Sequence, residues 1–591
     1  MIKITGMKRS GWTVTCAILL IVCVHFLVIP GRPARAGQAS FSTLVDSYLD
    51  WFALHHPSIA AGNGLHQHDD RLEDFSASAV AGEIADLNRW RERLRAIDPD
   101  SLPADERVDH RILEGIIDGW LLDLETVQTW RRNPMVYAAA ITDGVHNLMN
   151  MESSPPEARM RRIIAKLKGV DALLAAARQN VVNPPRLLAQ CSLAMFRGAS
   201  TMLRRDLLLA FRPAGDAAAG LAMKQAGEGA AQAVDRYAAY LEREVIPRAR
   251  GAVAIGKRNL EARYRDEELI DLPADQLLAI GERELGRVQE QFRATAARLA
   301  PGRDPMKAWA EVLADHPARG ALVPAAQRAL DDLLAFIRTK RLMDLPDHDP
   351  VVVAAAPEYA LGLAAMHSSP PLEPTPVKSF YYITDARPDW SADAQDAWLR
   401  KFNYATLSDI TAHEVYPGHF AHSLFMRRTP GKIRRIWIGL NPFPQPSSGQ
   451  DGWAHYAEQM ILDEGFHADD PRYRLAQLSE ALTRICRLIV GIRIHTGSWT
   501  VEDGARCFEQ EAHLPGPAAQ QEAERATYDP TYGGYFLGKL ALLKLRRDVT
   551  EREGEAFDLR RFHERVMTDG IAPWWAHRQL LLPGDTRPVL E

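Results

Sequence analysis

Amphipathic segments dominate the chain, with apolar residues returning at helical spacing and charged residues between them. In the segment from Pro273 to Leu299, apolar side chains recur every seventh residue at Leu278, Leu285, Phe292 and Leu299. This spacing predicts a helix with one face in the core, and Pro273 suits its first turn. The same pattern occupies residues 103–126, 156–179, 227–244, 324–340 and 471–491. A mainly α-helical fold is therefore predicted.

The segment from His348 to Trp390 departs from this pattern, because its many prolines prevent long helices. Within it, residues 379–384 read Ser-Phe-Tyr-Tyr-Ile-Thr, a run of aromatic and β-branched residues that is typical of a short strand. The sequence thus predicts a large helical body with a small β element.

Residues 413–419, His-Glu-Val-Tyr-Pro-Gly-His, concentrate side chains that bear chemistry. Neutral histidine nitrogens can bind Zn²⁺, and a carboxylate that is not a ligand can accept the proton of an activated water. On an unbroken helix a step of six residues would leave the two histidine rings roughly 120° apart. Pro417 and Gly418 are therefore expected to end the helix, Gly418 by permitting unusual dihedral angles, and to turn His419 back toward His413. The alternative is a helix end with two incidental histidines.

A second polar helix is predicted from Asp451 through Leu462, after residues 441–450, which contain too much proline, serine and glycine for a helix. Steps of four and three place three polar side chains on one face: Asp451, His455 and Glu458. Trp453 and Tyr456 lie on the other side and indicate that the helix is packed. The alternative is a solvated face, since acidic residues near a helix start suit its dipole. Two histidines from the first segment and a carboxylate from this one would make a catalytic zinc site with an open position.

The two motifs together resemble a known family. His-Glu-x-x-Pro-Gly-His, followed by Gly-Trp-Ala-x-Tyr-x-Glu, is similar to the bacterial domain-of-unknown-function family 885, whose mostly helical members are grouped with zinc metallopeptidases. Other segments that resemble the family extend over nearly the whole mature chain: 66–70, 108–113, 276–282 and 535–540, with Arg546 beyond. The resemblance implies a helical zinc peptidase.

The resemblance also suggests the third metal ligand. The second motif is similar to the Asn-Glu-Gly-Phe-Ala-x-Tyr helix of gluzincin-type aminopeptidases, in which the Glu before Gly binds zinc and a second Glu, seven residues on, lies behind it. That first position is Asp451 here, one methylene shorter, so His455 or Glu458 could instead complete the site. With Asp451 as ligand, Glu458 would orient a ligating histidine through its other ring nitrogen. By analogy with zincin-like enzymes, residues 379–384 are a candidate cleft edge for extended peptide.

Further residues are assigned catalytic and substrate-binding roles. Glu414 is the expected general base. Gluzincin-type enzymes commonly use a tyrosine to stabilise the oxyanion, and Tyr535 matches the family pattern Tyr-x-x-Gly-Lys, with Tyr528 as the second candidate. The alternative is that these tyrosines only pack. Arg525 and Lys539 are expected to bind a substrate carboxylate, unless they belong to a solvated face.

The amino terminus indicates export. Basic residues precede an apolar run over residues 12–30, and Ala-Arg-Ala at 34–36 offers a cleavage site. We predict a signal peptide over residues 1–36, cleaved after Ala36, and a periplasmic or secreted protein without stable membrane association. The alternative is a membrane anchor formed by residues 12–30.

Composition adds few constraints. The net charge of −5, with both signs interspersed, gives no reason to expect a nucleic-acid partner. No repeat or low-complexity linker is evident, so residues 37–591 are predicted to form a single catalytic domain. The cysteines of the mature chain cannot all pair within it, which makes disulfides optional: Cys191, Cys486 and Cys507.

The sequence as a whole predicts an exported hydrolase of peptide or amide substrates, with one Zn²⁺ per chain held by His413, His419 and Asp451. The alternative is a helical exported binding protein that keeps the scaffold without the chemistry, with Asp451 as a sign of decay. The presence of Glu414 beside both histidines argues against it, because a binding protein has no use for an unpaired general base.

Overall fold

The computed structural model describes residues 36–211, 217–357, 364–442 and 448–591. The predicted signal peptide, except Ala36, and the alternative anchor over residues 12–30 lie outside the described residues. Among the helices that are described, none combines the length and the apolar character needed to cross a membrane.

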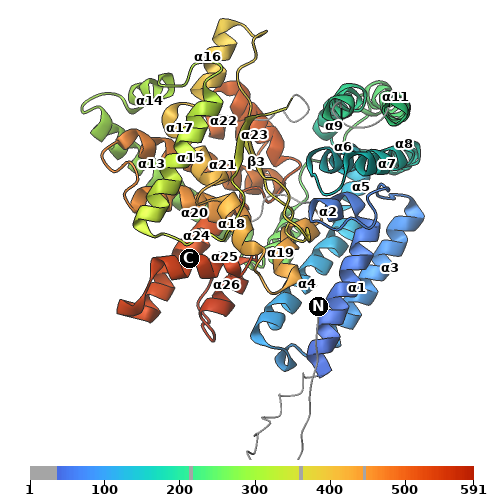
Figure 1. The fold of residues 1–591 in the computed structure, drawn as a ribbon, viewed down its shortest axis with the longest axis horizontal. Helices are drawn as coiled ribbons and strands as arrows, with labels where there is room; N and C mark the ends of the chain where they lie inside the picture. Colours follow the sequence, from blue (N-terminus) through green and yellow to red (C-terminus); the bar gives the residue numbers. More distant parts are fainter. Residues whose placement is uncertain (1–35, 212–216, 358–363, 443–447) are drawn as a thin grey trace, which may run out of the picture.

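The structure confirms a mainly α-helical fold (Figure 1). The amino-terminal helices, blue to teal in Figure 1, lie on one side of the molecule: α1 (Ala36–His55), α2 (Pro57–Gly62), α3 (Ala77–Arg95), α4 (Ala104–Leu121), α5 (Thr129–Arg132), α6 (Met135–Asn150), α7 (Pro156–Leu167), α8 (Val170–Asn180), α9 (Arg186–Thr201), α10 (Leu207–Ala210) and α11 (Ala217–Tyr240). Short π-helical turns follow α4, α9 and α11: Leu122–Val127, Met202–Asp206 and Leu241–Val245.

The later helices form the larger body, green to red in Figure 1: α12 (Lys257–Glu267), α13 (Ala274–Leu299), α14 (Pro305–Ala314), α15 (Leu322–Lys340), α16 (Ala392–Arg400), α17 (Tyr404–Glu414), α18 (His419–Met426), α19 (Lys432–Ile436), α20 (Gln450–Asp463), α21 (Pro471–His495), α22 (Val501–Glu511), α23 (Gly516–Ala526), α24 (Gly534–Glu553), α25 (Leu559–Thr568) and α26 (Trp574–Leu581). Single 3₁₀ turns occur at Pro99–Ser101, Trp437–Leu440 and Gly554–Ala556.

Helix positions follow the predictions closely where one apolar face is continuous. The helix predicted over 273–299 is α13, in which Phe292 is buried while Leu278, Leu285 and Leu299 pack only partly against the same core. The buried face is centred instead on Leu277, Ile280 and Val288. The single helix predicted over 156–179 is wrong, because the chain breaks at residues 168–169 into α7 and α8.

A three-stranded sheet lies in the proline-rich segment. The predicted strand is β3 (Phe380–Ile383), and it lies between β1 (Val352–Ala355), to which it is parallel, and β2 (Ala364–His367), to which it is antiparallel. In the register, Val352 and His367 both pair with Phe380. Both edges of β3 are therefore occupied, and β2 has one edge that pairs with no other strand of the described chain.

The buried apolar residues form three clusters. The largest surrounds α13 and α21 in the later body, and a second occupies α6 to α11. The third joins α1, α3 and α4 to α19 and to α26, the last helix of the chain. Segments from the two ends of the chain thus share one core, while the assignment of 37–591 to a single domain stays a prediction.

Candidate metal centre

The two histidines of the first motif lie on successive helices. The side chain of Asn403 caps α17 by accepting a hydrogen bond from Thr406 N at 3.0 Å, and α17 ends at Glu414. After a four-residue turn, 415–418, α18 begins at His419. The indole Nε1 of Trp453 donates to the carbonyl oxygen of Pro417 at 2.9 Å, which ties this turn to α20.

Gly418 lies in the turn as predicted, with φ −76° and ψ −131°. A Cβ at this position would overlap the carbonyl oxygen of His413. The absence of a side chain is therefore what lets the chain fold back on α17.

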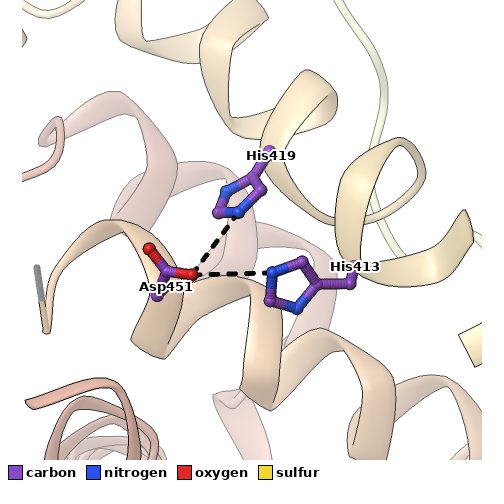
Figure 2. A group of neighbouring side chains, drawn as sticks. All are labelled: His413, His419 and Asp451. Carbon is purple, nitrogen blue, oxygen red and sulfur yellow. Dashed lines mark ion pairs between the residues drawn. The ribbon is translucent and has the colours of Figure 1, made fainter. Parts of the chain in front are cut away.

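His413, His419 and Asp451 converge from three helices, as Figure 2 shows. Asp451 Oδ1 lies 3.6 Å from His413 Nε2 and 3.8 Å from His419 Nε2, and the two rings are nearly perpendicular at a centroid distance of 4.7 Å. Ligand atoms about 2.1 Å from a tetrahedral zinc lie roughly 3.4 Å from one another. The spacing of the three donors and their chemical types are thus compatible with a zinc site that has an open position. Their role as ligands stays a prediction.

A buried carboxylate holds His413 from behind. Glu458 is fully buried and accepts three hydrogen bonds, from His413 Nδ1 at 2.6 Å, His455 Nδ1 at 2.8 Å and Arg484 Nη2 at 2.9 Å. Burial opposes ionisation, yet the charge of Arg484 and these hydrogen bonds hold the pKa of Glu458 well below its usual range. An ionised Glu458 fixes the Nδ1–H tautomer of His413 and directs Nε2 toward Asp451.

The two histidines differ in their charge state without a metal. Burial lowers the pKa of His413, but its interactions with the carboxylates of Asp451 and Glu458 outweigh it and raise that pKa to about 10. Burial and the charge of His413 lower the pKa of His419 to about 3. Without a metal, His413 is therefore the cationic histidine, with an N–H toward each of the two carboxylates, and His419 is neutral.

His455 lies beside the donor cluster but does not join it. Its Nδ1 is engaged by Glu458, and its Nε2 is buried without a partner among the described residues. Lys539 is also buried, and its charge lowers the pKa of His455. Burial, with the nearby charge of Arg484, lowers the pKa of Lys539 itself to about 8. Lys539 thus belongs to a buried charge network, and a contact with substrate stays a prediction.

Glu414 is the last residue of α17, and its side chain reaches the sheet. Burial raises the pKa of Glu414, and its Oε2 accepts a hydrogen bond from the backbone N–H of Met366 on β2 at 3.1 Å. The strand beside the site is therefore β2. The expectation that residues 379–384 form the cleft edge is wrong, because β3 is hydrogen-bonded on both sides.

The predicted tyrosines and Arg525 lie near the start of α24. Tyr535 is almost fully buried, and its hydroxyl oxygen accepts a hydrogen bond from Arg525 Nη2 at 2.5 Å. Burial and the charges of Asp529 and Asp451 raise the pKa of Tyr535. Arg525 also binds Asp529, through Nε at 3.2 Å and Nη2 at 3.0 Å, so these two nitrogens are used within the protein. Tyr528 is half-buried.

Arg484 is a site residue that the sequence reasoning missed. It lies on α21 between Thr483 and Ile485, and it joins Glu458 to Glu480, whose Oε2 is 3.2 Å from Nη1. The available signal was a charged residue in the mostly apolar run of residues 481–492, because such a residue is rarely buried without a partner.

Comparison with known proteins places the fold among solved but functionally undescribed structures. A candidate lipoprotein of unknown function from Shewanella oneidensis superimposes with a TM-score of 0.76 and 23% identity, covering 92% of this chain and 99% of that one. A candidate lipoprotein from Colwellia psychrerythraea gives a TM-score of 0.75 and 18% identity, covering 92% and 98%. No match is found among curated proteins.

The sequence itself identifies the family. Residues 57–577 match the family described as bacterial protein of unknown function, DUF885, a range that includes every donor of the candidate metal centre. The chain therefore belongs to the DUF885 family of bacterial proteins.

Proposed function

We propose that the protein is an exported zinc-dependent hydrolase that cleaves peptide or other amide bonds. The observation that carries this proposal is the cluster of His413, His419 and Asp451 with the carboxylate of Glu414 next in sequence to one donor. The resemblance of the second motif to the helix of gluzincin-type aminopeptidases supports the choice of an amide bond. The apolar amino terminus supports export, as do the descriptions of both solved relatives as candidate lipoproteins.

A zinc ion held by His413, His419 and Asp451 would supply Lewis acidity, which polarises a carbonyl and acidifies a water molecule. Glu414 would accept the proton of that water and pass it to the departing amine. Its raised pKa, which results from burial, brings the carboxylate closer to the pH at which it can do both.

Two neighbouring groups would prepare the site. Glu458 keeps His413 in the tautomer that presents Nε2, through the 2.6 Å hydrogen bond at Nδ1. Arg525 donates to the oxygen of Tyr535, so the hydroxyl proton of Tyr535 remains available for the oxygen that gains charge as the carbonyl is attacked.

The test replaces Glu414 with glutamine, which keeps the shape and removes the proton acceptor. Zinc content should persist, while hydrolysis of a mixture of short peptides, followed by mass spectrometry, should fall by roughly 10²-fold or more. Glu311→Gln, on the exposed face of α14, is the matched control and should act as wild type. Unchanged hydrolysis would remove Glu414 from the mechanism, and loss of zinc would make it a ligand.

A further inference from the structure

A cavity opens beside the candidate metal centre. It has a volume of about 270 Å³ and lies between α18, α19 and the end of β2, and its lining includes His419, Met366, His367, Arg435 and Ile438. One wall thus includes His419, a predicted metal ligand. Another wall is β2, whose backbone N–H at Met366 donates to Glu414. A molecule that occupied this cavity would lie next to the proposed reacting centre.

Arg435 is the cation of this cavity. It lies on α19, which packs on α4 at the border between the amino-terminal helices and the larger body (Figure 1). Its Nε donates to the carbonyl oxygen of Thr429 at 2.6 Å, which fixes the direction of the side chain. Across the described chain, no carboxylate oxygen lies within 4.0 Å of its guanidinium nitrogens.

The preceding residue shows what a structural arginine looks like at this position. Arg434 is fully buried, and three carboxylates surround its guanidinium: Asp109 at 2.8 Å, Asp105 at 3.4 Å and Asp569 at 3.8 Å. Arg435, half-buried and one residue on, has no such partner in the part of the chain that is described. The contrast indicates that Arg435 is not held as a structural ion pair.

A second guanidinium adds to the uncompensated positive charge. Arg427, at the end of α18, donates to the carbonyl oxygens of Pro370 and Glu373 at 2.8 and 2.6 Å. Burial and the charge of Arg435 lower the pKa of Arg427. The carboxylate of Glu373 partly offsets this repulsion, but His66 Nε2 already binds it at 2.8 Å.

We infer that Arg435 binds a carboxylate of the substrate in the cavity beside His419. The Nη groups of Arg435 bind no other residue in the described parts of the chain, so they can form charge-assisted hydrogen bonds with a carboxylate, which would also relieve the repulsion from Arg427. This inference rests on the proposed hydrolase function and specifies its substrate. The carboxylate is either the carboxyl terminus of a short peptide or an acidic side chain.

The experiment compares three peptides: Ala-Ala-Ala as the free acid, the same peptide as its carboxy-terminal amide, and the amide of Ala-Ala-Glu. Binding is measured by calorimetry in the Glu414→Gln variant, which needs no turnover. At least one of the two peptides that carry a carboxylate, the free acid or Ala-Ala-Glu amide, should bind at least tenfold more tightly than Ala-Ala-Ala amide, and Arg435→Gln in the same background should abolish the difference. Arg428→Gln, exposed one turn before α19, is the matched control and should preserve it.

The outcomes separate this inference from the proposed function. No binding of any peptide, or affinities for the free acid and for Ala-Ala-Glu amide that both equal the affinity for Ala-Ala-Ala amide, would overturn the role of Arg435 whatever wild type hydrolyses. Acid-selective binding that depends on Arg435, without hydrolysis by wild type, would instead overturn the proposed function alone. A preference for Ala-Ala-Glu amide over Ala-Ala-Ala amide that is lost in Arg435→Gln would identify a side-chain carboxylate as the ligand.

Discussion

Replacing Glu458 with glutamine should weaken zinc binding by about 10–100-fold while leaving the proposed ligands in place. The carboxylate has two oxygens that serve three N–H donors, from His413, His455 and Arg484. Glutamine offers one oxygen, so at least one donor must lose its acceptor and face an amide group instead. Without the hydrogen bond at Nδ1, the His413 ring can change tautomer and rotate, so Nε2 is no longer held toward the position of the metal.

The magnitude follows from the kind of hydrogen bond that is lost. A hydrogen bond to a charged group contributes about 1.5–3 kcal/mol, and a 10–100-fold change in affinity corresponds to about 1.4–2.8 kcal/mol. The variant should also unfold at a lower temperature, because Arg484 keeps only Glu480, and breaking a buried ion pair costs about 3–5 kcal/mol.

Zinc affinity is measured by competition with a chromophoric chelator, at a temperature where circular dichroism shows the variant to be folded. Glu480→Gln is the matched control. Glu480 also binds Arg484, at 3.2 Å, but unlike Glu458 it does not bind His413. It should change zinc affinity less than twofold. A Glu458→Gln protein that binds zinc as tightly as this control would refute the reasoning.

Two further predictions concern the same site. In the metal-free protein burial lowers the pKa of His413 but is outweighed by the interactions with Asp451 and Glu458, which raise that pKa to about 10, so zinc must displace one proton. The apparent association constant should therefore rise about tenfold per pH unit between pH 6 and 8, and a pH-independent constant would contradict this. Gly418→Ala should lose tight zinc binding, because the added Cβ meets the carbonyl oxygen of His413. The control is Gly229→Ala, on α11, where open space surrounds the glycine. This variant should bind zinc normally and unfold at the same or a higher temperature. Equal zinc binding by the two variants would argue against the crowding at Gly418.

Helices were predictable from the sequence because local signals and tertiary packing agree there. The predicted start of α21 at Pro471 coincides with the observed one, where Asp470 caps the helix and proline occupies its first turn. The strands β1 and β2 were missed because each has only four residues and half of them are alanine, which has a low strand preference. They are strands only because β3 pairs with both.

The candidate site, too, was only partly predictable from the sequence. The spacing between His413 and His419 required a break in the helix, and the break lies at residues 415–418. The crowding of Gly418 against His413 could not be predicted, because it exists only in the folded turn. Arg434 and Arg435 are neighbours of identical type in the sequence, and only the folded chain shows that one is enclosed by carboxylates and the other lines a cavity.

The zinc content of the purified protein tests the central claim most directly. Emission spectrometry on protein prepared without chelator should find about one Zn²⁺ per chain in wild type, and little in His413→Ala, His419→Ala and Asp451→Ala. If Asp451→Ala retains zinc while Glu458→Ala is metal-free, the carboxylate ligand is Glu458. Substoichiometric metal in wild type and in all variants alike would contradict the existence of the site.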